Sequence, residues 1–201
     1  DKGYFKEEIV PVEVESRKGT FTVEHDEHIR ETSIEQLSKL KPRFVREGVV
    51  TPGNASGMVD GAAAVVVTTE EYAVKNGLKP IARVISWDAV GVEPKYRGIG
   101  PVPAIKNSLK KAGLKLEEID LIEINEAFSA QYLACQKELD FDPEIGNVNG
   151  GAVAIGHPLA ASGTRITYSL IKELKRRNRK YGLASACIGG GQGVAILIEA
   201  F

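Results

Sequence analysis

Cysteine, long apolar runs and net charge are all scarce in this chain of 201 residues. Its two cysteines, Cys135 and Cys187, are too few for a disulfide framework, which favours a reducing compartment, and we expect the cytoplasm. No apolar stretch reaches the roughly 20 residues that cross a bilayer, and none resembles a signal peptide, so we expect neither membrane insertion nor export. A net charge of −1 argues against the basic surface that nucleic-acid or membrane-surface binders use.

The chain does contain the material for a globular core, with 43% hydrophobic and 26% charged residues. It begins at Asp1 rather than at a methionine and enters a charged stretch directly. We therefore expect it to be part of a longer protein.

A composition change divides the chain into two regions. Residues 1–47 are dense in charge, and short alternating runs at 9–14 and 20–23 predict brief strands on an exposed lobe. Ser33 and Gln36 resemble a capping box that opens a short helix at 34–40. A glycine-rich passage at 48–61 follows, and we place a domain boundary there.

After residue 60 the pattern alternates between strands and helices, which predicts an α/β layered fold. The apolar run at 61–67 predicts a strand buried on both faces, and Trp87 is expected in the core. Further strands are expected at 81–87, 119–124, 183–188 and 194–199, and helices at 70–76, 104–112, 128–139 and 162–178.

Asn125 lies between a predicted strand and a predicted helix, in the motif Asn-Glu-Ala-Phe at 125–128. Asparagine is a preferred N-cap, so one interpretation is purely structural. The alternative is that its amide faces a cavity and holds a water or a substrate oxygen. Ligands of open α/β sheets bind at the carboxyl ends of the strands, which favours that alternative.

His157 lies in a glycine-rich segment and is followed by Pro158, which restricts its backbone to extended conformations. A histidine held rigidly in this way suits a general base or an oxyanion donor. The structural alternative is a surface turn in which the histidine is incidental.

Cys187 ends a predicted buried strand and adjoins the glycine-rich turn at 189–193. Such a cysteine is often an inert small hydrophobe, but here backbone N–H groups can point at an anion or oxyanion. The turn lacks the spacing of a dinucleotide-binding loop, and a strand rather than a helix is expected after it, so we reject a Rossmann fingerprint.

Four segments together resemble the thiolase family in order and spacing, over essentially the whole chain. They are the glycine-containing segment at 54–62, the motif at 125–128, the segment at 149–158 and the segment at 187–193. Within the family, the residues of these segments most resemble those of the biosynthetic type, acetyl-CoA acetyltransferase. The resemblance implies a thiolase-like layered fold, a mixed sheet between helices.

The resemblance also implies catalytic roles. Cys187 resembles the acid/base that takes the α-proton of acetyl-CoA, for which a lowered thiol pKa is expected. His157 resembles the histidine that activates the nucleophilic cysteine and helps form one oxyanion hole, and Asn125 the asparagine that holds a water there. The N–H of Gly189 resembles a donor of the second oxyanion hole.

Substrate contacts are implied in the same way. Ala55 and Ser56 resemble the segment that contacts pantetheine, Phe128 a wall of the pocket, and Arg30 a residue near the nucleotide. The resemblance implies no cofactor and no metal, because the coenzyme A thioester is itself substrate or product. His25 and His28 have no further ligands nearby in sequence, and we interpret them as parts of a solvated loop.

One departure from the family pattern concerns the acyl-accepting cysteine, which in the family lies in a Cys-Gly-Ser-Gly-like setting in the first half. Neither cysteine here has that context, and Cys135 lies in the apolar stripe of a helix, where core packing is expected. We therefore expect the first half to be mostly missing and the second half complete. The predicted division is 1–58, the remainder of a cap domain; 59–79, the last strand and helix of the first half; and 80–201, the second half.

Three functions stay open from the sequence. The first is condensation of two acetyl-CoA to acetoacetyl-CoA plus coenzyme A, and the reverse thiolysis, with the isolated chain inactive. The second is a degradative 3-ketoacyl-CoA thiolase, and the third is a non-catalytic acyl-CoA-binding protein. The expected partners are acetyl-CoA or acetoacetyl-CoA, the missing first half, and further copies in a homodimer or homotetramer.

Overall fold

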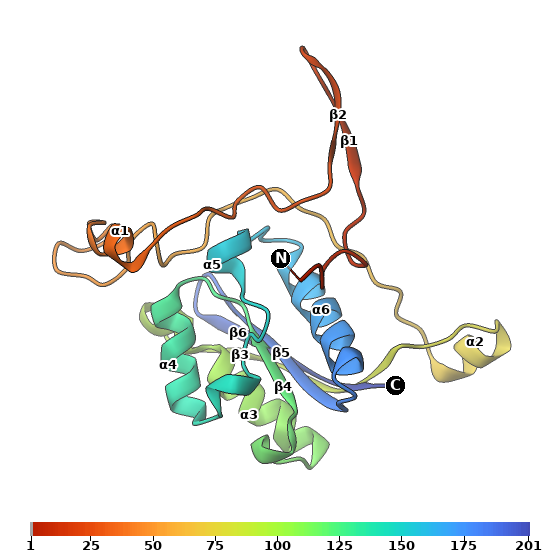
Figure 1. Ribbon diagram of the computed structural model, residues 1–201. Helices are drawn as coiled ribbons and strands as arrows, with labels where there is room; N and C mark the ends of the chain where they lie inside the picture. The colour runs from red at the N-terminus through yellow and green to blue at the C-terminus, as the bar shows by residue number, and fades with distance from the viewer. Residues whose placement is uncertain (1) are drawn as a thin grey trace.

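The computed structural model describes residues 2–201, and its centre is a four-stranded mixed sheet in the order β3-β6-β5-β4 (Figure 1). The antiparallel part pairs β3 with β6 and β6 with β5, and β5 runs parallel to the edge strand β4. The strands span β3 Ala82–Gly91, β4 Leu121–Ile124, β5 Tyr181–Ile188 and β6 Gln192–Ala200.

Helices cover both faces of this sheet (Figure 1). The helices α3 (Pro101–Ala112) and α4 (Ser129–Leu139) lie on one face, and α6 (Ser162–Arg176) lies on the other. The expected mixed sheet between helices is thus confirmed. Short elements complete this part, namely η1 (Pro94–Ile99), η2 (Leu116–Glu118), η3 (Pro143–Ile145) and α5 (Ala152–Ile155).

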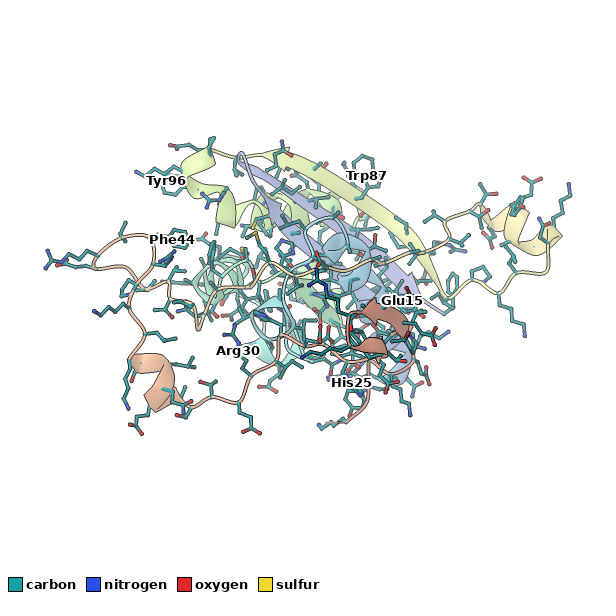
Figure 2. All side chains as sticks on the ribbon, turned by 90° about the horizontal axis from the view of Figure 1, so that it is seen from above. Glu15, His25, Arg30, Phe44, Trp87 and Tyr96 are labelled. Carbon is teal, nitrogen blue, oxygen red and sulfur yellow. The ribbon has the colours of Figure 1, made fainter. Side chains whose placement is uncertain are left out.

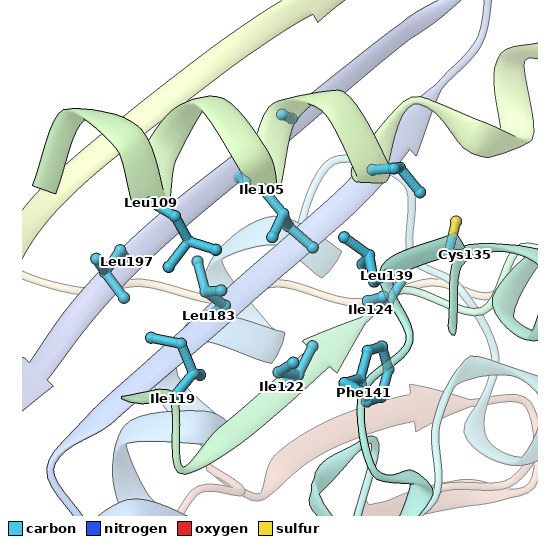
Figure 3. Close-up of a cluster of buried hydrophobic side chains, with 13 residues drawn as sticks. Ile105, Leu109, Ile119, Ile122, Ile124, Cys135, Leu139, Phe141, Leu183 and Leu197 are labelled. Carbon is cyan, nitrogen blue, oxygen red and sulfur yellow. The ribbon is translucent and has the colours of Figure 1, made fainter. Parts of the chain in front are cut away.

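Two apolar clusters hold the layers together, one on each face. On the α3 and α4 face, Ile105, Ile122 and Leu183 are fully buried, and Cys135 packs with them as expected (Figure 3). On the other face, residues of α6 such as Leu170 pack on the sheet in a second cluster. Alternation along each strand explains the two clusters, because neighbouring residues of a strand point to opposite faces.

Except near contacts such as those of Glu8 with Ser169 of α6 and of Ser56 with Ala127, residues 2–79 extend away from this layered part (Figure 1). They form an antiparallel hairpin of β1 (Val12–Ser16) and β2 (Gly19–Val23), and two short helices, α1 (Ile34–Ser38) and α2 (Glu70–Lys75). Ser33 caps α1 as predicted, since its hydroxyl accepts from the N–H of Gln36 at 3.2 Å. The division of the chain at 58/59 and 79/80 stays a prediction.

The strand predicted at 61–67 is wrong. These residues adopt no strand, and Val66 is 90% exposed. A strand forms by pairing with a neighbour, and within residues 2–201 no neighbouring strand lies beside this run. The apolar residues at 61–67 therefore form a segment that pairs with no strand within residues 2–201.

The core position predicted for Trp87 is also wrong. Trp87 is 61% exposed and points away from the sheet on the outer side of β3 (Figure 2). Its ring lies 5.5 Å from the Lys111 ammonium, which lies over the ring face.

Residues 2–201 include no helix that is both long enough and apolar enough to cross a membrane.

Candidate active site at the carboxyl edge of the sheet

Two of the polar residues singled out in the sequence, Asn125 and Cys187, lie at the same edge of the sheet, where β4 and β5 end. Because β4 and β5 are parallel, their carboxyl ends lie at the same edge, with Ile124 opposite Ser185. Asn125 continues β4, and its N–H donates to the Ser185 carbonyl at 2.9 Å. Cys187 lies two residues further along β5, about 7 Å from Ser185 at the usual rise of a strand.

Asn125 is not a helix cap, so the structural interpretation of this residue is wrong. The helix α4 begins only at Ser129 and Phe128 occupies its N-cap position, because residues 125–128 form a loop after β4. The Asn125 side chain is instead buried, with 2% of the residue exposed. Its Oδ1 has no hydrogen-bond partner among residues 2–201, which is costly for a buried acceptor and fits a hydrogen-bond donor nearby, such as a water.

His157 lies directly beside Asn125, although 32 residues separate them in sequence. Asn125 Nδ2 is 3.4 Å from His157 Nε2, and His157 Nδ1 is 2.6 Å from the Ser162 hydroxyl. An amide nitrogen only donates, so Nε2 accepts here and the ring proton lies on Nδ1, which donates to Ser162. This tautomer leaves the Nε2 lone pair facing the Asn125 side of the site.

The backbone around His157 explains its fixed position. Gly156 has a φ of 92°, a left-handed conformation, and a Cβ there would lie 2.4 Å from Val59. The His157 N–H donates to the Gly57 carbonyl at 2.8 Å. Burial, together with the positive charge of Arg165, holds the pKa of His157 below its usual value, which keeps the ring neutral near neutral pH.

Cys187 is a half-buried free thiol. Burial raises the pKa of this thiol above its usual value, against a smaller lowering from a backbone hydrogen bond and from Arg97. The lowered pKa expected for Cys187 is therefore wrong for the chain as it stands. The β5–β6 turn at 189–191, which contains Gly189, lies directly after this strand, and a strand rather than a helix follows it as predicted.

The segment of Ala55 and Ser56 lies against the Asn125 loop. Ser56 donates to the Ala127 carbonyl from its N–H at 3.1 Å and from its hydroxyl at 3.2 Å. Ala55 pairs with Phe128 in an isolated antiparallel bridge. The structure thus brings three of the four predicted substrate-contact residues to one place beside the site.

Arg30 is the predicted site residue that does not join this cluster. It is exposed on the segment between β2 and α1 (Figure 2). None of the hydrogen bonds or ion pairs found within residues 2–201 joins its side chain to Asn125, His157 or Cys187. Its role near the nucleotide stays a prediction.

Sequence reasoning missed three residues that hold the site. Ser162 bonds the His157 ring, and Glu126 and Asn147 link the loops on which Asn125 and His157 lie. Glu126 lies in the motif at 125–128 directly after Asn125, so a polar residue adjacent to a candidate was the available signal there, whereas Asn147 precedes the segment at 149–158 and carried no such signal. Their contacts join segments more than 20 residues apart, which spacing alone does not reveal.

Metal ligation finds no support in the part of the chain that the structure describes. Over residues 2–201, no group of three or more His, Cys, Asp and Glu side chains is arranged to hold a metal ion. His25 is exposed, and its ring lies 3.8 Å from the neighbouring Glu24 carboxylate (Figure 2).

Comparison with known families agrees with this geometry. The family model described as "Thiolase, C-terminal domain" matches residues 78–200, and the one described as "Thiolase, N-terminal domain" matches residues 1–71. The mixed sheet with helices on both faces, with Asn125 and His157 in contact at its edge, is the α/β fold of the solved thiolases. The chain belongs to the thiolase family.

Relatives with two different activities in their names match the chain. The chain is 56% identical over 200 residues to the mitochondrial 3-ketoacyl-CoA thiolase of Bos taurus, covering 99% of this chain and 50% of that protein. It is 53% identical over 198 residues to the acetyl-CoA acetyltransferase of Shinella zoogloeoides, covering 98% and 50%. The crystal structure of the Bacillus anthracis acetyl-CoA acetyltransferase superimposes with a TM-score of 0.97 at 52% identity, covering 99% of this chain and 51% of that one.

The chain therefore spans about half the length of the curated relatives that it matches.

Proposed function

We propose that this chain supplies the second half of a thiolase active site, in a longer protein that condenses two acetyl-CoA to acetoacetyl-CoA plus coenzyme A and catalyses the reverse thiolysis. The contact between Asn125 and His157 at the carboxyl edge of the sheet carries the proposal. Family membership adds acyl-transfer chemistry, and the unpaired Oδ1 of buried Asn125 adds an acceptor for a bound water.

The proposed condensation has two reacting cysteines with different roles. An acetyl group is held as a thioester on a cysteine that lies outside the 201 residues. The Cys187 thiolate takes the α-proton of a second acetyl-CoA, and the resulting carbanion attacks the acyl carbonyl. The C–C bond forms as the nucleophilic thiolate leaves, and the product is acetoacetyl-CoA.

During this reaction, negative charge develops on the thioester oxygen of the second acetyl-CoA and on that of the acyl-enzyme. Each of these two oxygens therefore needs hydrogen-bond donors. Asn125, through a bound water, and His157, once protonated at Nε2, are the donors for one, and the N–H of Gly189 is a donor for the other. Removing one donor of such a hole lowers kcat by about 10²–10³-fold. Ala55, Ser56 and Phe128 are the proposed contacts for pantetheine and the acyl pocket.

The Cys187 thiol needs help to ionise, because burial raises its pKa in this chain. The groups that lower it act from nearby, and Arg97 is one of them. Further lowering is expected where substrate and the remainder of the protein complete the site. Neither Cys135 nor Cys187 has the family setting of the nucleophile, so we propose that the 201 residues alone do not turn over.

Degradative 3-ketoacyl-CoA thiolysis is the second candidate. It is favoured by the 56% identity to a mitochondrial 3-ketoacyl-CoA thiolase, against 53% to an acetyl-CoA acetyltransferase. Thiolysis rates on full-length protein with 3-ketoacyl-CoA substrates of increasing chain length separate the two. The acetyl proposal expects the highest kcat/KM with acetoacetyl-CoA, and a clear preference for medium or long chains overturns it.

The resemblance to the thiolase family also supports proposals on oligomeric state, compartment and cofactor. We propose a homodimer or homotetramer in the cytoplasm with no bound cofactor, since coenzyme A thioesters are the substrates. Light scattering of the full-length protein tests the assembly, and cell fractionation tests the compartment. A full-length protein that binds acyl-CoA without condensation or thiolysis would instead support the non-catalytic alternative.

A further inference from the structure

One carboxylate links the loop that carries Asn125 to the segment that carries His157. Glu126 Oε1 accepts from Asn147 Nδ2 at 3.1 Å, and Glu126 Oε2 accepts from the N–H of Val153 at 3.1 Å. Val153 lies in α5, and His157 follows the end of α5 after Gly156. The single side chain of Glu126 therefore spans both segments of the site.

Asn147 anchors the other end of this link on the sheet. Its Oδ1 accepts from the N–H of Ile124 at 2.8 Å, and its Nδ2 donates to the Ile124 carbonyl at 2.9 Å. Ile124 is the last residue of β4 and directly precedes Asn125. Both backbone groups at the base of the Asn125 loop are thus held by the side chain that also holds Glu126.

Gly151 leaves the space that the Glu126 carboxylate fills. A Cβ on Gly151 would lie 2.6 Å from Glu126 Cδ. The φ of Gly151 is −163°, ordinary extended backbone, so the missing side chain rather than the torsion is what the position requires. The clashing atom is the end of a flexible side chain, so an added methyl group would move the carboxylate rather than unfold the protein.

We propose that Glu126 is a positioning residue that sets the separation of Asn125 and His157. It touches no reacting atom in this scheme and acts through Asn147 and Val153. The inference rests on the proposed function for its kinetic consequence, but the link itself is a property of the folded chain.

The kinetic test uses the full-length protein and the variant Glu126→Ala. We expect kcat for thiolysis to fall by about 10- to 100-fold, because a displacement of about 1 Å in a reacting constellation can cost 10²-fold. KM is expected to change less than about threefold, and Glu126→Gln, whose amide oxygen keeps one acceptor, should recover part of kcat. The matched control is Glu138→Ala, at an exposed position on α4.

A double-mutant cycle separates positioning from general damage. Gly151→Ala alone should lower kcat, because it displaces the carboxylate. Added to Glu126→Ala it should have little further effect, since the side chain with which it clashes is absent. Additive losses would overturn the proposal, as would kcat within about twofold of wild type in both single variants.

A readout without substrate distinguishes failure of this proposal from failure of the proposed function. Hydrogen exchange of the Val153 amide should accelerate in Glu126→Ala, and the ring nitrogen shifts of His157 should change in NMR spectra. If the wild-type protein shows no thiolase activity, these two measurements still decide the positioning role. Unchanged Val153 protection together with unchanged His157 shifts would refute it, and Gly151→Ala provides the same readout if Glu126→Ala does not fold.

Discussion

Among single residues, His157 shows most directly how the site depends on its neighbours. The Ser162 hydroxyl lies 2.6 Å from Nδ1 and Asn125 Nδ2 lies 3.4 Å from Nε2, so each ring nitrogen has its own partner. A second partner that fixes the tautomer is what a histidine needs to act as a base at one chosen nitrogen.

Ser162→Ala should remove the preference for the Nδ1-protonated ring. Nitrogen-15 NMR of the imidazole should then show a mixture of tautomers, and kcat for thiolysis in the full-length protein should fall by at least about tenfold. Gly163→Ala is the matched control, because it lies in the same turn of α6 and its added Cβ meets no atom within 4 Å. An unchanged tautomer in Ser162→Ala would contradict the assigned hydrogen bond.

Residue types and motif positions predicted the site better than they predicted its chemistry. Asn125 and His157 were both identified from the sequence, and the structure brings them into contact. The direction of the Cys187 pKa shift was wrong, because burial by residues distant in sequence outweighs the nearby backbone and charge. The partners Ser162 and Glu126 were missed for the same reason, since which side chains meet is decided by packing.

For whole elements, the approach of α3 to β6 sets the most severe steric demand. A Cβ on Gly193 would lie 2.0 Å from the carbonyl oxygen of Gly100, and one on Gly100 would lie 2.5 Å from the Gln192 carbonyl. Backbone meets backbone there, so no side chain can move aside to make room.

Gly193→Ala should therefore lower the free energy of unfolding by about 1–3 kcal/mol or more, the range for inserting atoms into a packed interior. Urea denaturation followed by circular dichroism measures this. Gly91→Ala is the control on the neighbouring strand, since its Cβ meets nothing within 4 Å. Equal stability of the two variants would show that α3 does not contact β6 so closely.

Buried Glu123 on β4 makes the free energy of unfolding depend on pH. Burial raises the pKa of Glu123 to about 8 from 4.5, against the lowering effect of Arg165, and carboxylates of Glu126, Glu173 and Glu8 raise it further. Between these two values the folded chain holds a proton that the unfolded chain has released. The contribution of Glu123 to stability is therefore fully present below about pH 4.5 and is lost as pH rises through about 8.

Glu123→Gln should remove this dependence, because the amide resembles the protonated acid and does not titrate. We expect the urea midpoint of the variant to exceed that of the wild type near pH 9 and to match it more closely near pH 5. Glu144→Gln, at an exposed position, is the control. Parallel stability profiles of wild type and Glu123→Gln would argue that the carboxyl is not buried.

Hydrophobic periodicity correctly predicted the helices and strands that pack against other elements of this chain. The helix expected at 162–178 and the strands expected at 183–188 and 194–199 correspond to α6, β5 and β6 within a few residues. The strand expected at 61–67 failed, and Trp87 is exposed, because burial depends on what packs against a segment. Apolar pattern alone does not say whether that partner lies in the same 201 residues.

Across the whole molecule, the layered part contains the buried core, whereas residues 2–79 are mostly exposed. Val66 in the first region and Trp87 on β3 are both large hydrophobic residues with exposed side chains, and exposed apolar surface of this kind marks an interaction site or an aggregation risk. This is consistent with the proposal that the chain works as half of a longer thiolase.

The most direct test of the account is thiolysis of acetoacetyl-CoA by coenzyme A, measured on the full-length protein, its Asn125→Ala, His157→Ala and Cys187→Ser variants, and the 201-residue chain alone. We predict turnover by the full-length protein, losses of about 10²-fold or more in kcat for each variant with unfolding midpoints preserved, and no turnover by the isolated chain. Undiminished turnover in the Cys187→Ser or His157→Ala variant would contradict the account.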